Sequence, residues 1–234
     1  MTREGRCTEM DQIVGREREL AALAEMLSAA VAGSPRFLVV EGPLGSGKSA
    51  LLSEAALIAE RAGARVLRAW GSAGERDLAF GVVGQLFELA LDGEPRQERR
   101  VWLRGPAAAV PMILSLDTGP GGPAGKPDEQ AASRAVYWLT ANIARRTPLV
   151  VVVDDLQWAD PDSLRWLLHL SRRLQRLPLA VVGALCPDVP ASTSGLMAQL
   201  LSGVHRLPLP GLVTRSSRRA RSASMRWTVA GLRR

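Results

Sequence analysis

Residues 41–52 read EGPLGSGKSALL, and this stretch decides the fold. It matches the pattern GxxxxGK[ST] at four positions: Gly42, Gly47, Lys48 and Ser49. The short apolar run RFLVVEG (36–42) leads into it, and the residues from Lys48 onward favour a helix. A strand, a glycine-rich turn and a helix in this order are the context that a phosphate-binding loop (P-loop) requires. The sequence therefore predicts that a phosphorylated ligand is held here.

Each residue type in the loop suits that task. Glycines let the backbone curl so that successive N–H groups face one phosphate, and the helix N-terminus adds its dipole. Lys48 is expected to reach the β- and γ-phosphates as a catalytic cation, and the Ser49 hydroxyl to join a Mg²⁺ shell. We expect the loop to bind a nucleotide through the following residues: Gly42, Pro43, Gly45, Ser46, Gly47, Lys48, Ser49 and Ala50.

A pair of acids follows the most apolar segment of the chain, PLVVVVDD (148–155). Asp154 comes directly after the apolar run, at the carboxyl end of a buried strand, where open α/β sheets bind ligands. We expect Asp154 to hold Mg²⁺ through water and Asp155 to orient or activate the attacking water. The simpler alternative is that the two acids merely open a loop. Farther on, Asp160 before Pro161 is expected to cap a helix.

Periodicity elsewhere completes the fold class. Buried strands are predicted at 36–42, 64–71, 148–155 and 177–185, with a last edge strand at 206–212. Helices are predicted between them, including 80–91, 129–146 and one from Asp160. Alternating strands and helices predict an α/β fold, a parallel sheet with helices on both faces. We expect a leader at 1–11, one domain at 12–212 with a surface loop at 117–128, and a disordered arginine-rich tail at 213–234.

The net charge of +7 belongs to that tail. Eight arginines and no acidic residue follow Asp188, so the first 188 residues carry a net charge of 7 − 8 = −1. The sequence shows no apolar run long enough to cross a membrane and no apolar leader, and we expect a cytoplasmic protein. Cys7 and Cys186 have no spacing that predicts a disulfide or a metal site.

Three stretches together carry a family resemblance: IVGREREL (13–20), the P-loop (42–49) and VVVVDDLQWADPDSLRWLLHL (150–170). Over residues 12–212 the chain resembles the ATPase domain of the large ATP-binding regulators of the LuxR family. Those regulators belong to the STAND branch of AAA-like P-loop NTPases. The resemblance implies ATP or ADP with Mg²⁺ as cofactors, and it implies that Val14, Gly15 and Arg16 lie near the adenine and ribose.

In that family the nucleotide acts as a switch: the ADP form is closed, and an inducer favours exchange to ATP and oligomerisation that activates transcription. This chain departs from the pattern at two points. Relatives carry an arginine that senses the γ-phosphate where Cys186 stands here. The family chain also continues into a helical lid, repeats and a DNA-binding part, which do not fit into the 22 residues after Leu212.

Three functions therefore remain open at the level of sequence. The first is an ATP- or ADP-binding switch core, at most a slow ATPase, because Asp155 is one methylene shorter than the glutamate usual in vigorous relatives. The second is an ATP-dependent nucleic-acid-binding protein of the initiator-like AAA type, although specific DNA binding by this chain is not expected. The third is a truncated fragment that binds nucleotide poorly. Self-association or an inducer-dependent oligomer is a further expectation.

Overall fold

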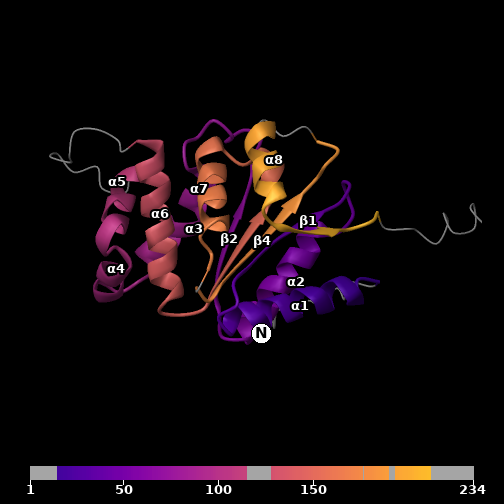
Figure 1. The fold of residues 1–234 in the computed structure, drawn as a ribbon, viewed down its shortest axis with the longest axis horizontal. Coiled ribbons are helices and arrows are strands. Elements are labelled where there is room, and N and C mark those ends of the chain that lie inside the picture. The colour runs from indigo at the N-terminus through magenta and orange to yellow at the C-terminus, as the bar shows by residue number, and fades with distance from the viewer. Residues whose placement is uncertain (1–14, 115–127, 176, 190–192, 212–234) are drawn as a thin grey trace, which may run out of the picture.

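The computed structural model describes residues 15–114, 128–175, 177–189 and 193–211. The predicted leader at 1–11, nearly all of the predicted surface loop and the predicted tail at 213–234 lie outside these ranges. Five parallel strands form one sheet in the order β2-β3-β4-β1-β5 (Figure 1). The strands are β1 (Arg36–Glu41), β2 (Arg65–Trp70), β3 (Leu149–Asp154), β4 (Leu179–Leu185) and β5 (His205–Pro208).

Helices connect the strands as predicted. The helices are α1 (Glu17–Val31), α2 (Lys48–Arg61), α3 (Gly81–Asp92), α4 (Arg96–Trp102), α5 (Val110–Ile113), α6 (Glu129–Ala144), α7 (Pro161–Ser171) and α8 (Ser194–Ser202), with short 3₁₀ turns η1 (Gly105–Ala109) and η2 (Leu156–Trp158). The sequence did not predict α4, α5 or α8, which are short. In Figure 1, α4 and α5 lie at the end of the molecule away from β1.

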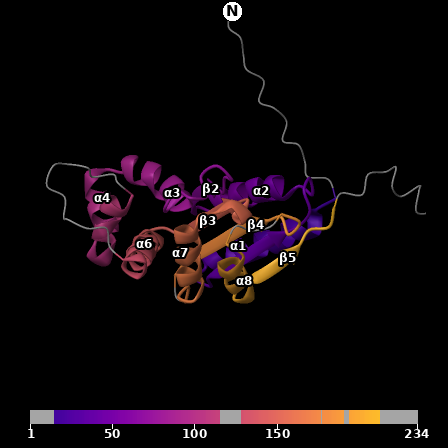
Figure 2. The same cartoon turned by 90° about the horizontal axis from the view of Figure 1, so that it is seen from above.

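Two apolar cores cover the two faces of the sheet, which confirms the predicted α/β architecture. Alternate residues of one strand divide between them: Val150 and Val152 pack with α1 and α2, whereas Val151 and Val153 pack with α3, α6 and α7. Figure 2 shows α2 on one side of the strands and α8 on the other. Both central strands, β3 and β4, are apolar on both faces because helices cover both.

Sequence-local signals place the element ends. The Asp160 carboxylate accepts a hydrogen bond from the Ser163 N–H at 2.9 Å, and Pro161 takes the first position of α7, as predicted. Asp128 caps α6 in the same way through the Ala131 N–H at 2.6 Å. Among the described strands β5 pairs only with β1, so Pro208 lies on an edge strand of the described sheet, where a missing N–H is tolerated.

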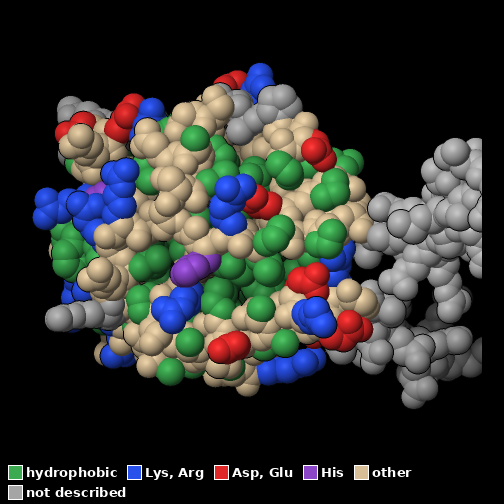
Figure 3. All heavy atoms as spheres, turned by 45° about the vertical axis from the view of Figure 1, so that its right-hand side comes forward, with side chains coloured by type: hydrophobic (Ala, Val, Ile, Leu, Met, Phe, Trp, Pro, Cys, Tyr) green, Lys and Arg blue, Asp and Glu red, His purple; other side chains and the backbone are tan. Residues whose placement is uncertain are grey.

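Charges of both signs are interspersed on the face shown in Figure 3, which agrees with a body of nearly balanced charge. Within the described ranges, no helix is both long and apolar enough to cross a membrane.

Candidate nucleotide-binding site

The glycine-rich loop between β1 and α2 has the backbone that its sequence predicts. Gly45 and Gly47 have φ of 73° and 88°, in the left-handed region that favours glycine. Gly42 is required for a different reason. A Cβ atom on it would lie 2.4 Å from the Leu209 carbonyl oxygen, so the residue that follows β5 packs directly against the start of the loop.

Lys48 curls back over the same loop. Its Nζ donates to the carbonyl oxygens of Gly42 and Pro43, both at 2.9 Å, and the residue is buried. The first N–H groups of α2, which Lys48 begins, have no partner within the helix. Gly47 at the N-cap supplies no side-chain acceptor for them either. Ser49 and Ala50 are exposed at this end. The N-terminus of α2 is thus a set of N–H donors open to an anion.

The two acids meet the loop at one cavity of about 390 Å³. Ser49 lines it from α2, and Asp154 and Asp155 line it from the carboxyl end of β3. Because β4 lies between β1 and β3, the loop and the acids come from strands that are not neighbours. Asp155 has a φ of 49°, and its N–H donates to Asp154 Oδ1 at 2.8 Å, so the pair forms a tight turn. The structure thereby brings Ser49, Asp154 and Asp155 together.

Gln157 is a site residue that the sequence reasoning missed. Its Nε2 donates to Asp155 Oδ1 at 2.8 Å, and its Oε1 accepts from the Cys186 N–H at 3.0 Å. Only 2% of the residue is exposed. The signal available in the sequence was a polar residue in the otherwise apolar segment between Asp155 and Ala159. Gln157 links the acid pair to the end of β4.

Asp160 does more than cap its own helix. Its carboxylate also accepts hydrogen bonds from the N–H groups of Phe80 at 3.0 Å and Val82 at 3.1 Å. One buried side chain therefore holds the N-termini of α3 and α7 together. The sequence predicted the cap on α7 but gave no sign of the contact with α3, which is 78 to 80 residues away.

The described part of the N-terminal motif, Gly15 and Arg16, packs against the P-loop through Arg16. Arg16 is buried, and its Nη2 donates to the Ser46 carbonyl oxygen at 3.1 Å and to the Pro210 carbonyl oxygen. Gly15 has a φ of 85°, and its N–H donates to Glu17 Oε1. Val14 lies outside the described residues. Arg16 thus contacts the P-loop, and the role of these three residues toward adenine and ribose stays a prediction.

Magnesium suits the donors at the cavity. Hydroxyl and carboxylate oxygens are the ligands that Mg²⁺ prefers, and it keeps several waters when it binds beside phosphates. Ser49 and Asp154 supply one of each at the same cavity. Among the described residues, no group of three or more His, Cys, Asp or Glu side chains forms a site for a metal held by protein alone. The residues therefore fit an ion that is shared with a phosphate.

The parallel sheet, the glycine-rich loop at a helix N-terminus and the acid pair define an α/β nucleotide-binding domain of the P-loop class. A family model described as "AAA ATPase domain" matches residues 12–182. The chain belongs to this family.

Among curated proteins, an uncharacterized protein of Rhizobium meliloti (strain 1021) is 25% identical over 198 residues. The match covers 73% of this chain but only 18% of that protein.

Solved structures resemble the chain at low sequence identity. Cdc6p from Pyrobaculum aerophilum matches with a TM-score of 0.50 and 15% identity over 84% of this chain and 46% of that one. The ORC1 protein of Aeropyrum pernix, solved in complex with DNA, has a TM-score of 0.47 and 19% identity over 90% and 50% of the two chains. AMPPCP-bound DnaA from Aquifex aeolicus has a TM-score of 0.46 and 14% identity over 94% and 53%. The chain spans about half the length of these proteins.

Proposed function

We propose that the chain is the core of an ATP- or ADP-binding switch with slow hydrolysis. One observation carries the proposal: Ser49, Asp154 and Asp155 line a single cavity beside the uncapped N-terminus of α2. Membership of the AAA ATPase domain family supports nucleotide binding.

The roles of the residues follow from their positions. The N–H groups of the loop and of the first turn of α2 bind the phosphates, and Lys48 leaves the carbonyl oxygens of Gly42 and Pro43 to reach the β- and γ-phosphates. Ser49 and Asp154 hold Mg²⁺, which neutralises phosphate charge when bound. Asp155 orients the water that attacks the γ-phosphate.

Slow turnover is expected from the same residues. Asp155 has a short side chain whose Oδ1 is already bonded to Gln157, so its carboxylate has little freedom to approach the γ-phosphate. Directly after β4, the buried Cys186 stands where the resembling family has an arginine, so no guanidinium is available there to sense or stabilise a transferring phosphate. Positioning and charge supply most of the rate in phosphoryl transfer. We therefore expect bound ATP to be hydrolysed slowly.

The proposal also includes a relationship to a particular group of nucleotide-dependent regulators. We infer a relationship to the STAND regulators of the LuxR family, with inducer-dependent self-association, transcription regulation and a cytoplasmic location. The WAD segment (158–160) supports this relationship, because it follows the paired aspartates in the stretch that carries the resemblance. The alternative of an initiator-like nucleic-acid-binding protein predicts DNA affinity that falls steeply with salt.

The test is calorimetry of Mg-ATP and Mg-ADP with Lys48→Ala. We expect affinity to fall at least about tenfold, because the loss of a charge-assisted contact to phosphate removes more than about 1.5 kcal/mol. Lys126→Ala removes the same charge outside the P-loop and serves as the control. Equal affinity in the wild type and in Lys48→Ala would remove the P-loop from the proposal.

A further inference from the structure

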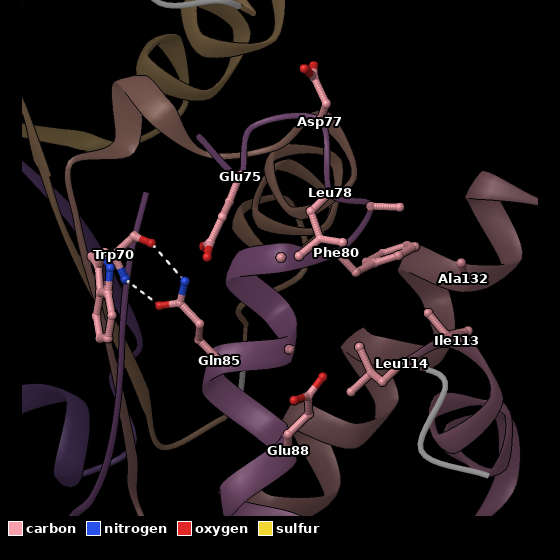
Figure 4. A pocket seen from close by; sticks show the side chains of 13 residues that line it. Trp70, Glu75, Asp77, Leu78, Phe80, Gln85, Glu88, Ile113, Leu114 and Ala132 are labelled. Carbon is pink, nitrogen blue, oxygen red and sulfur yellow. Dashed lines mark hydrogen bonds between the residues drawn. The ribbon is translucent and has the colours of Figure 1, made fainter. Parts of the chain in front are cut away.

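A second cavity, of about 580 Å³, lies over one face of α3 (Figure 4). Gly81, Gly84, Gln85 and Glu88 share that face, because they follow one another at helical spacing. Two of the four are glycines, so the floor of the cavity has no side chains there. A glycine inside a helix costs about 1 kcal/mol relative to alanine, and Gly84 is such a residue. The hollow is therefore kept open against helix stability.

The walls are largely apolar, and the charged side chains among the lining residues are all acidic. Phe80, Ile113, Leu114 and Ala132 form one wall, as Figure 4 shows. Glu75 reaches toward α3 from the loop above it and Glu88 projects from α3 near Leu114, whereas Asp77 points away. No lysine or arginine is among the described residues that line the cavity. An apolar body with a positive charge is complementary to such a lining.

The cavity shares a wall with the candidate nucleotide site. Trp70, which is 59% exposed, lines both this cavity and the one that contains Asp154 and Asp155. The Gln85 side chain holds its backbone: Oε1 accepts from the Trp70 N–H at 3.0 Å, and Nε2 donates to the Trp70 carbonyl oxygen at 3.1 Å. Both bonds are drawn in Figure 4.

The backbone after Trp70 packs directly on the acid pair. The Gly71 N–H donates to the Asp154 carbonyl oxygen at 2.9 Å, and a Cβ atom on Gly71 would lie 2.3 Å from the Asp155 carbonyl oxygen. Gln85, Trp70, Gly71 and the two aspartates therefore form a continuous chain of direct contacts.

We propose that the cavity over α3 binds a small organic cation with an apolar body, and that this ligand changes nucleotide affinity through Gln85 and Trp70. Glu75 and Glu88 pair with the cation, and the wall from Phe80 to Ala132 covers the apolar body. The volume of the cavity, about 580 Å³, lies within the range of roughly 300–1,000 Å³ that is typical of small-molecule sites. The second half of the proposal rests on the proposed nucleotide function, whereas the first half stands without it.

The first test compares three probes of one shape with the full chain in the absence of nucleotide: 4-phenylbutylamine, 4-phenylbutanol and 4-phenylbutyrate. By calorimetry at low salt and neutral pH, we expect the amine to bind about fivefold or more tightly than the alcohol, and the carboxylate to bind most weakly. The double variant Glu75→Gln/Glu88→Gln should abolish this preference, while Glu25→Gln, an exposed residue of α1, should preserve it. Equal binding of amine and alcohol by the wild type, or an unchanged preference in the double variant, would overturn the site.

Gly84 offers a variant that tests the cavity without harming the fold. A Cβ atom at Gly84 would meet only the flexible end of Glu88, at 2.8 Å from Oε1, so Gly84→Ala should leave the melting temperature equal or higher. We expect it to weaken amine binding by displacing Glu88. Unchanged amine binding in a folded Gly84→Ala protein would contradict the proposal that the ligand lies against the face of α3 that contains Gly84.

The second test measures coupling by titrating a fluorescent ADP analogue with and without saturating amine. We expect its affinity to change at least about fivefold, which is the lower end of typical coupling between sites, and Gln85→Ala to remove the change while the amine still binds. An unchanged ADP affinity in the wild type would overturn the coupling alone. A failure of nucleotide binding itself would be seen in the titration without amine and would count against the proposed function instead.

Discussion

The side-chain amide of Gln157 joins the Asp155 carboxylate to the Cys186 backbone N–H, with contacts of 2.8 and 3.0 Å. The bridge spans the carboxyl ends of β3 and β4, two neighbouring central strands. Gln157 thereby fixes the Asp155 carboxylate relative to the backbone of Cys186. In the proposed mechanism, Gln157 is therefore a positioning residue for Asp155.

Replacing Gln157 by glutamate keeps the acceptor for the Cys186 N–H but places a second carboxylate beside Asp155. We expect the turnover number to fall about tenfold or more with little change in ATP affinity, because small errors in the position of a reacting group are costly. Single-turnover hydrolysis and calorimetry on the same protein separate the two quantities. Gln175→Glu, an exposed position after α7, makes the same charge change as a control. An equal loss of affinity and rate would show a structural role only.

Asp154 and Asp155 should fail in different ways when each is replaced by alanine. Asp155→Ala is expected to keep nucleotide affinity and to abolish the remaining hydrolysis, because it removes the group that orients water. Asp154→Ala is expected to weaken the Mg²⁺ dependence of binding, because it removes an oxygen donor from the ion. Titrations of ATP with and without EDTA, together with phosphate release, distinguish them. Turnover of several ATP per second by the wild-type chain would contradict the switch.

Asp160→Ala should be one of the most destabilising single changes in the described part of the chain. It leaves three buried N–H groups, of Phe80, Val82 and Ser163, without their acceptor. We expect a loss of about 3–5 kcal/mol in the free energy of unfolding, measured by urea denaturation. Asp162→Ala in the same turn removes a partly exposed ion pair with Arg165 and should cost less than about 1 kcal/mol. Similar losses of stability for the two variants would refute the conclusion that Asp160 holds the N-termini of α3 and α7 together.

His169 gives the stability of the fold an acid-sensitive component. Burial first, and then the nearby charges of Arg173, Arg134 and Arg172, lower the pKa of His169 below its usual value. The unfolded chain therefore takes up this proton before the folded chain does, and stability falls as pH drops below about 6.5. Partial exposure keeps the effect to a fraction of a kcal/mol. Urea denaturation of His169→Gln should show a flatter slope between pH 5 and 6.5, roughly the window in which histidine titrates; an unchanged slope would assign it to other groups.

The part of the site that could be predicted from sequence is the part carried by local signals. The P-loop, the acids after β3 and the cap at Asp160 each lie within a few residues of the pattern that predicts them. The strands were predictable because central parallel strands are apolar runs between turn residues. The sheet order was not, because it depends on pairing between segments far apart in the chain.

The missed residues act across such distances. Gln157 reaches Cys186, and Gln85 reaches Trp70, through single side-chain amides that have no spacing signature. The helix α4 was not predicted because its sequence, RQERRVW, has little apolar periodicity. Among its residues only Trp102 is buried. The elements η1 and α5 were not predicted because Pro106 and Pro111 disfavour a helix interior. In the structure each proline lies in the first turn, where proline is tolerated.

The contact of Arg16 with both Ser46 and Pro210 means that the first and last described parts of the chain meet behind the phosphate loop. Circular permutation is the practical consequence, since chains whose ends lie close together tolerate being rejoined. In a version trimmed to residues 15–211, a short linker from Gly211 to Gly15 would join the two new termini, and the chain could be reopened near Gly93, in the turn between α3 and α4. A permutant of residues 15–211 that melts with the cooperativity of its trimmed parent would carry both termini at the turn between α3 and α4 instead of at the P-loop.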